Sequence, residues 1–309
     1  MKKIRYMIEY WAFLSVAFIF NHISQASADH MGRFLGSIWY MVDPKHKNIA
    51  MTNIGFAFPE MREKERKLII KENFKVLGTT LANFPRISKL NKTNINEIVT
   101  FEGTENYEIA KKRGKGVFIL TSHLGNWELA AAAQSIRYDG LIAVAKDIHN
   151  PYIDRYIKSM RNHAGIDIVK PRNSVFRLLR AIKHGKTIAM LIDQNTLRHE
   201  AVFVKFFGKP AATQYAMALM ALKTGAAVVP GYVIKNPDGS GYTIRYEEPI
   251  ILKNEDDKEL AVLKWTQYFT TLIERHIKAS PEQWFWVHNR FKTEPVEEDI
   301  KRLEALENR

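Results

Sequence analysis

The chain has 309 residues, 46% of them hydrophobic and none of them cysteine, with a formal net charge of +13 at pH 7; this length allows one large α/β domain or two small ones. The absence of cysteine excludes disulfide bonds, thiolate metal sites and a cysteine nucleophile. The positive charge favours anionic partners, namely nucleic acid, an anionic membrane surface, phosphorylated lipids or an acidic carrier protein.

Residues 1–40 predict a membrane anchor followed by a juxtamembrane helix. Basic residues at positions 2, 3 and 5 precede an apolar run over residues 10–20, which is shorter than the ~20 apolar residues of a free-standing span. The Ala-Ser-Ala sequence at 26–28 resembles a signal-peptidase site, so a cleaved secretory signal is the alternative. We favour an uncleaved anchor, because the run is aromatic-rich and a second apolar helical pattern follows at once. This anchor would dip into or marginally cross the bilayer, with its basic flank on the cytoplasmic side.

Residues 41–309 are expected to form one α/β domain, helical over 41–95 and carrying the catalytic core over 96–309. Apolar residues at helical spacing predict a helix over 61–81. Beyond residue 96, short apolar strands alternate with helices, and 242–246 predicts a hairpin edge after a turn at 236–239. Strands separated by helices imply a mainly parallel central sheet with helices on both faces. The other predicted strands are 116–121, 140–145, 187–192 and 227–234, and the other helices are 129–133, 151–162, 174–184, 215–224 and 259–278.

The segment Ser-His-Leu-Gly-Asn-Trp-Glu at 122–128 carries the most informative residues, because it follows a predicted buried strand, where open α/β sheets place their sites. On one continuous helix His123 and Glu128 would lie ~140° apart. We therefore expect His123 in the loop and Asn126 as the N-cap of a helix whose first turn holds Glu128. The two side chains could then meet, and a carboxylate beside an imidazole fixes its tautomer and stabilises the imidazolium. The alternative is a capped helix whose histidine merely packs, but the strand end, the turn and the acid spacing coincide here.

Other catalytic patterns are absent from the sequence. No Gly-x-Ser-x-Gly elbow occurs and there is no cysteine, which favours direct attack by an acceptor hydroxyl over an acyl-enzyme. No cluster has metal-ligand spacing, so neither a metal nor a cofactor is expected.

The segment from Thr121 to Glu128 resembles the His-x4-Asp/Glu motif of the glycerolipid acyltransferase superfamily. Its form, His-x-Gly-Asn-Trp-Glu, resembles the lipid A biosynthesis branch, the late lauroyl and myristoyl acyltransferases. The resemblance covers nearly the whole chain and implies an O-acyltransferase of lipopolysaccharide biosynthesis. The other similar segments are 53–59, Asn150-Pro151 with Arg161, Asp193-Gln194 with 202–208, and the C-terminal signature 281–292.

This resemblance implies an acyl-carrier-protein thioester as donor and a phosphorylated glycolipid, the Kdo-bearing lipid A precursor, as acceptor. It places the catalytic domain on the cytoplasmic face of the inner (plasma) membrane. His123 would be the general base on the acceptor hydroxyl, with Glu128 as its partner. From the residue types alone, Arg161 could be a solvated charge, Asp193 a turn cap, and Trp284 core or part of an interfacial belt. The substrate-binding residues would be Arg161, Asn126, Asp193, Gln194 and Arg290.

Two alternatives stay open at this point. The same chemistry could acylate another glycolipid, such as a phosphatidylinositol mannoside. A non-catalytic basic protein that binds membranes or nucleic acid is the alternative from a different class, and it predicts that Glu128→Ala leaves function intact. The basic residues are spread out, and no helix-turn-helix, zinc finger or aromatic RNA-binding motif occurs, so nucleic acid is not an expected partner.

Overall fold

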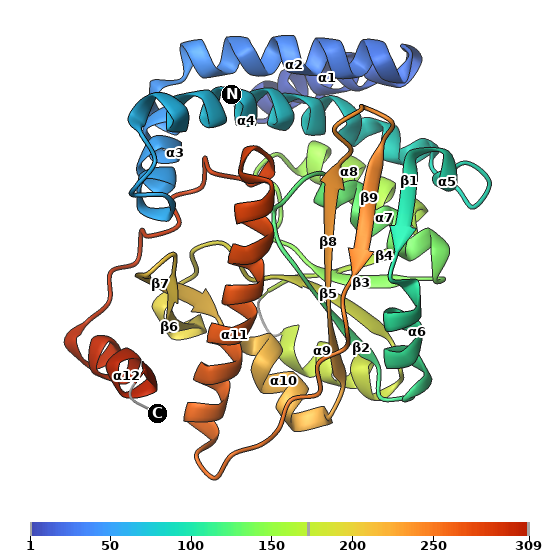
Figure 1. Ribbon diagram of the computed structural model, residues 1–309. Coiled ribbons are helices and arrows are strands. Elements are labelled where there is room, and N and C mark those ends of the chain that lie inside the picture. The colour runs from blue at the N-terminus through green and yellow to red at the C-terminus, as the bar shows by residue number, and fades with distance from the viewer. Residues whose placement is uncertain (1, 172–173, 308–309) are drawn as a thin grey trace.

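A mainly parallel sheet forms the centre of the protein, with helices on both of its faces (Figure 1). The computed structural model describes residues 2–171 and 174–307, and seven strands of the described chain form this sheet. Neighbouring strands are parallel except β8 and β9. The predicted fold class is therefore confirmed. In spatial order the strands are β1 (Val99–Glu102), β9 (Tyr242–Tyr246), β8 (Ala227–Lys235), β2 (Val117–Thr121), β5 (Thr187–Leu191), β3 (Leu141–Val144) and β4 (Ile166–Val169).

The predicted helices and strands recur with boundaries shifted by a few residues, whereas β1, β4 and the separate hairpin β6–β7 (Ala201–Phe206 and Lys209–Gln214) were not predicted. Short 3-10 turns are η1 (Phe84–Lys89), η2 (Arg198–Glu200) and η3 (Pro281–Gln283). The helices before the sheet are α1 (Lys2–His22), α2 (Gln25–Val42), α3 (Pro44–Ala57), α4 (Glu63–Asn83) and α5 (Ile95–Ile98). The later helices are α6 (Thr104–Lys112), α7 (Trp127–Arg137), α8 (Pro151–His163), α9 (Ser174–Lys183), α10 (Ala216–Thr224), α11 (Lys258–Ala279) and α12 (Glu297–Glu307).

The central strands are buried on both faces, because alternate side chains of a strand point to opposite sides. Phe118 and Leu120 of β2 join an apolar core that also includes residues of α4, α9, α10 and α11. Val117 and Ile119 of the same strand join a second core with residues of α6, α7 and α8. The continuous apolar run predicted at 116–121 is thus explained by burial on both faces.

Helices α1, α2 and α4 lie together at one end of the molecule (Figure 1). Glycines let the backbones of α2 and α4 touch, since a Cβ on Gly78 would lie 2.1 Å from the carbonyl oxygen of Gly32 and one on Gly36 would lie 2.2 Å from that of Phe74. Residues on both sides of position 40 thus share one helical layer. The boundary between a membrane anchor at 1–40 and a domain at 41–309 stays a prediction. Among the described residues, no helix is both long enough and apolar enough to cross a membrane.

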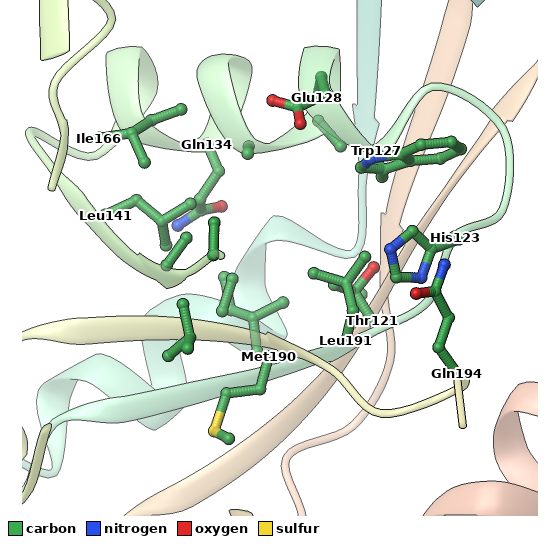
Figure 2. A pocket seen from close by; sticks show the side chains of 18 of the residues that line it. Thr121, His123, Trp127, Glu128, Gln134, Leu141, Ile166, Met190, Leu191 and Gln194 are labelled. Carbon is green, nitrogen blue, oxygen red and sulfur yellow. The ribbon is translucent and has the colours of Figure 1, made fainter. Parts of the chain in front are cut away.

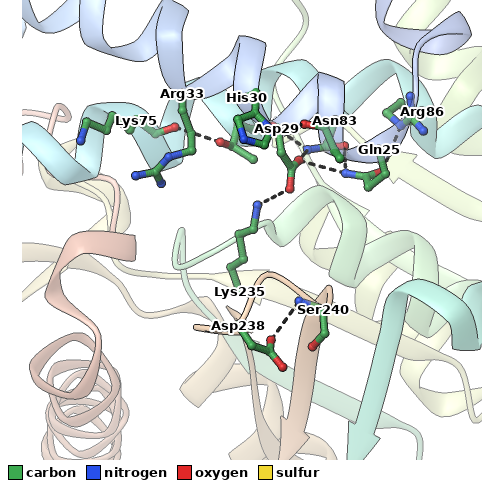
Figure 3. A network of polar contacts seen from close by, with 12 residues as sticks. Gln25, Asp29, His30, Arg33, Lys75, Asn83, Arg86, Lys235, Asp238 and Ser240 are labelled. Atoms are coloured by element: carbon green, nitrogen blue, oxygen red, sulfur yellow. Dashed lines mark hydrogen bonds and ion pairs between the residues drawn. The ribbon is translucent and has the colours of Figure 1, made fainter.

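A polar network joins this helical layer to the sheet (Figure 3). Asp29 of α2 forms an ion pair of 2.5 Å with Lys235 at the end of β8, and both side chains are 18% exposed. Asn83 of α4 donates to the same aspartate at 2.7 Å. Arg86 of η1 donates to the carbonyl oxygens of Phe20 and Ile23 at the end of α1. The helical layer is therefore bound to the sheet by a partly buried ion pair and by hydrogen bonds.

Candidate active site

The carboxyl ends of β2 and β5 bring His123 and Asp193 together. Thr121 pairs with Leu191 in the register of these parallel strands, so the residues two positions further on lie opposite each other. The Nδ1–H of His123 donates to Asp193 Oδ1 at 2.9 Å, and the backbone N–H of His123 donates to Asp193 Oδ2 at 2.8 Å. The Asp193 side chain has no exposed surface, whereas that of His123 is 20% exposed.

The Asp193 carboxylate fixes the tautomer of the His123 ring. Burial raises the pKa of this carboxyl, but the charge of His123 and the hydrogen bonds from His123 and from the Trp284 indole outweigh burial and hold the pKa below its usual value. The ionised carboxylate keeps the imidazole proton on Nδ1. Nε2, which has no hydrogen-bond partner in the described part of the chain, is therefore the nitrogen free to accept a proton.

Glu128 pairs with Arg161 of α8. Arg161 Nε donates to Glu128 Oε2 at 3.1 Å and Nη2 donates to Oε1 at 2.5 Å, a two-pronged geometry typical of arginine with carboxylate. The predicted N-cap is confirmed, since Asn126 Oδ1 accepts from the N–H of Leu129 at 3.1 Å. This cap starts α7 so that its first turn directs Glu128 toward α8. The contact between His123 and Glu128 expected from their spacing does not form among the described residues.

A cavity of about 420 Å³ lies between α7 and the sheet, and His123, Glu128 and Arg161 line it. Figure 2 shows His123 and Glu128 at this cavity. His123 and Gln194 stand at one end, with the Gln194 amide directed toward the imidazole, while Leu141 and Ile166 lie at the other. The α7 wall of the cavity is formed by Trp127, Glu128, Ala130, Ala131 and Gln134. The apolar lining includes Ile119, Ala130, Ala131, Leu141, Ala143 and Ile166.

Residues 1–293 match the model of the bacterial lipid A biosynthesis acyltransferases. The chain belongs to this family. A lipid A biosynthesis acyltransferase of Haemophilus influenzae is 26% identical to it, over 87% of this chain and 85% of the relative. The lipid A biosynthesis lauroyltransferase of Escherichia coli K12 is 25% identical, over 92% of each chain. The palmitoleoyltransferase of the same organism is 24% identical, over 93% of this chain and 92% of the relative.

This lipid A acyltransferase is an O-acyltransferase, which sets aside the alternative of a non-catalytic binding protein. The predicted family is thereby confirmed. Among solved structures, the 1-acyl-sn-glycerophosphate acyltransferase PlsC of Thermotoga maritima is 16% identical, with a TM-score of 0.40 over 83% of this chain and 99% of the other. That weak likeness adds nothing to the family assignment.

Three predicted substrate-binding residues of the acyltransferase, Asn126, Asp193 and Arg290, are not among the residues that line the cavity, and Asp193 instead holds His123. Asn126 is 1% exposed, serves as the cap of α7, and lines a separate pocket with Gln25, Asn83 and Arg86. Arg290 has no exposed surface. Its guanidinium donates to the Ala212 carbonyl oxygen at 2.6 Å and to the Thr213 hydroxyl, and burial lowers its pKa to about 10. In this conformation Arg290 supports β7.

Sequence reasoning missed the partner of His123 and the role of Trp284. Asp193 follows β5 by the same number of residues as His123 follows β2, and this equal offset was the available signal. Trp284 is 1% exposed, and its Nε1–H donates to Asp193 Oδ2 at 2.7 Å. A buried tryptophan that needs an acceptor for its N–H was a second signal.

Proposed function

We propose that the enzyme transfers a fatty acyl chain from an acyl-carrier-protein thioester to a hydroxyl of a phosphorylated, Kdo-bearing lipid A precursor, on the cytoplasmic face of the inner membrane. The observation that carries this proposal is a largely apolar cavity lined by His123, whose ring is held by Asp193, and by the ion pair of Glu128 and Arg161. The net charge of +13 supports an acidic carrier protein and a phosphorylated acceptor as partners.

The acyl chain would occupy the space between α7 and the sheet. Its lining includes Ile119, Leu141, Ala143 and Ile166, and burying the chain against such apolar side chains would remove about 0.8 kcal/mol of unfavourable hydration for each CH₂. The thioester carbonyl would then lie at the polar end, near His123 and Gln194. Binding the chain in this way positions the carbonyl for attack before the acceptor arrives.

His123 would act as the general base. Its Nε2 takes the proton of the acceptor hydroxyl as the hydroxyl oxygen attacks the thioester carbonyl carbon, and Asp193 stabilises the resulting imidazolium. The tetrahedral intermediate then collapses, the C–S bond breaks, and the imidazolium gives its proton to the leaving thiolate. The products are an ester and a free thiol, and the enzyme returns to its starting state without an acyl-enzyme.

Glu128 stays a predicted catalytic residue, and its contact with Arg161 gives it a role in placing that cation. Both side chains are largely buried, at 17% and 16% exposure, and line the cavity. A guanidinium held by two hydrogen bonds is pre-organised to stabilise negative charge at the thioester oxygen or on an acceptor phosphate.

The test is acyl transfer by the detergent-purified full chain, followed by mass spectrometry. The donors are lauroyl-, myristoyl- and palmitoleoyl-acyl carrier protein, and the acceptor is Kdo-bearing lipid A precursor. Transfer by the wild type that falls by about 10²–10⁴-fold in His123→Ala supports the base. Transfer only to another glycolipid, such as a phosphatidylinositol mannoside, would overturn the acceptor and keep the chemistry. Transfer that survives His123→Ala and Glu128→Ala would refute the mechanism.

A further inference from the structure

A segment near the C-terminus, made of the end of η3 and the turn that follows it, lies between the helical layer and the catalytic loops. We call residues 282–288 the strap. On one side it contacts the His123 loop: the Phe285 N–H donates to the His123 carbonyl oxygen at 3.0 Å, and the Gly125 N–H donates to the Gln283 carbonyl oxygen at 2.9 Å. Leu124 and Trp284 form an isolated antiparallel β-bridge there. The strap therefore fixes the backbone that carries the proposed base.

The strap also reaches the second half of the proposed catalytic pair. The Trp284 indole N–H donates to Asp193 Oδ2 at 2.7 Å, and His288 Nε2 accepts from the Asn195 N–H at 3.1 Å. Asp193 and Asn195 lie in the loop that follows β5. One short segment thus holds the loop after β2 and the loop after β5 in register with each other.

Two buried asparagines of the helical layer hold the opposite side of the strap. Asn73 of α4 donates through Nδ2 to the carbonyl oxygens of Glu282 and Trp284, at 2.8 and 2.6 Å. Asn53 of α3 donates in the same way to those of Trp286 and His288, both at 2.7 Å. The asparagines are 0% and 3% exposed. The carbonyl oxygens of the even-numbered residues thus accept from the asparagines, while the Gln283 carbonyl oxygen and the Phe285 N–H bond to the His123 loop.

We propose that Asn73 and Asn53 are positioning residues for acyl transfer, which act through the strap and Trp284 on His123 and Asp193. This inference rests on the proposed function of the His123–Asp193 pair. Each amide uses both of its N–H groups on strap carbonyls two residues apart, an arrangement that fixes the strap lengthwise. A shift of the strap would move the Trp284 indole away from Asp193 and the Phe285 N–H away from His123.

The first arm of the test uses kinetics with lauroyl-acyl carrier protein and Kdo-bearing lipid A precursor. Trp284→Phe keeps an aromatic ring in the space but removes the donor to Asp193. Asn73→Ala removes the two hydrogen bonds from Asn73 to the strap. We expect kcat to fall at least tenfold in each, with KM for the donor changed less than threefold. Trp39→Phe is the matched control, because Trp39 donates to the Asp43 carboxylate at 3.0 Å away from the site.

Asn83→Ala controls for loss of stability in the same helix. Asn83 is 6% exposed, and its Nδ2 donates to Asp29 and to the Thr79 carbonyl oxygen (Figure 3). We expect Asn83→Ala to lower the melting temperature as Asn73→Ala does while kcat stays within twofold of the wild type. Equal losses of kcat at equal losses of melting temperature would overturn the proposal, because the asparagines would then serve the fold alone.

The second arm needs no substrate. We expect the His123 Nδ1–H that donates to Asp193 to give a far-downfield proton resonance, which would be identified by its absence in His123→Ala. We expect this resonance to shift or broaden in Trp284→Phe and Asn73→Ala and to stay unchanged in Trp39→Phe and Asn83→Ala. An unchanged resonance in all four variants would overturn the proposal. If the wild type transfers no acyl chain, the proposed function fails, and this arm still decides whether the strap positions the pair.

Discussion

Glu128 and Arg161 form a unit at the scale of single residues, because each is the hydrogen-bond partner of the other at the cavity. We predict that Arg161→Lys lowers kcat/KM at least tenfold, since an ammonium cannot reproduce the two-pronged contact. Glu128→Gln should lower kcat/KM by a similar factor. The kcat/KM of the double variant should be no lower than that of the less active single variant. Steady-state acyl transfer measures all three. If the double variant lost kcat/KM by the product of the two single factors, the residues would act independently.

His288 makes the stability of the protein depend on pH. Burial, together with the nearby charge of His123, lowers the pKa of His288 to about 4 from its usual 6.5, and the neutral ring accepts a hydrogen bond from Asn195. Between those two pH values the unfolded chain binds a proton that the folded chain does not. The free energy of unfolding should therefore fall as the pH drops from 6.5 toward 4.

His288→Gln removes the titrating ring, while its amide oxygen can still accept from the Asn195 N–H. The pH dependence of the free energy of unfolding should therefore differ between the wild type and this variant. In urea unfolding at pH 7.0 and pH 4.5, the wild type should lose more stability than the variant. The excess should be about 1 kcal/mol, because solvent screens this partly exposed ring. An equal loss in both proteins would show that His288 is not protonated on unfolding in this range.

At the scale of secondary structure, the sequence predicted the elements that position His123. It did not predict the spatial order of the strands in the sheet. The apolar runs at 116–121 and 187–192 became β2 and β5, and the cap at Asn126 followed from its side chain. That β2 lies beside β5 depends on tertiary packing, and this neighbourhood brings Asp193 to the histidine. The spacing of His123 and Glu128 could not show that α7 turns Glu128 toward α8.

The missed strands have physical reasons. β1 and β4 have only four residues each, and each mixes buried with exposed positions, so they lack a long apolar run. The hairpin β6–β7 turns at Phe207 and Gly208, which have φ of 49° and 76°. Glycine fits such a two-residue turn, but a bulky residue with positive φ is uncommon, so the turn signal at this position is weak.

The alanines of α7 lead to a prediction on chain length. Ala131 lines the cavity, and Ala131→Leu would fill part of the space proposed for the acyl chain. The variant should prefer donors shorter than the wild type does by roughly two to four carbons, because each excluded CH₂ loses about 0.8 kcal/mol of burial. Competition among carrier-protein thioesters of different lengths, followed by mass spectrometry, measures the preference. Ala305→Leu on the exposed face of α12 is the control, and an unchanged preference in Ala131→Leu would place the chain elsewhere.

At the scale of the whole molecule, α1 has two different sides. One side packs on α8, the helix of Arg161: Tyr10 and Phe13 contact Tyr152 and Tyr156 in aromatic pairs. The other side exposes large apolar side chains, and so does α2, which lies beside α1 in Figure 1. We infer that this exposed face lies in the membrane interface, as an amphipathic surface does. The exposed residues are Ile4, Ile8, Trp11, Val16, Phe18 and Ile19 of α1 and Met31, Phe34, Leu35, Met41 and Val42 of α2.

This inference predicts how the full chain binds lipid vesicles. Trp11 and Phe18 are 60% and 63% exposed, and Trp11→Glu with Phe18→Glu replaces two apolar anchors with negative charge. Binding to vesicles that contain phosphatidylglycerol should weaken at least tenfold in a sedimentation assay, because burying one such side chain contributes about 1.5–3 kcal/mol. Phe176→Glu on α9, where the phenylalanine is 85% exposed, should bind like the wild type. Equal weakening by Phe176→Glu would mean that added negative charge, and not the face of α1, determines binding.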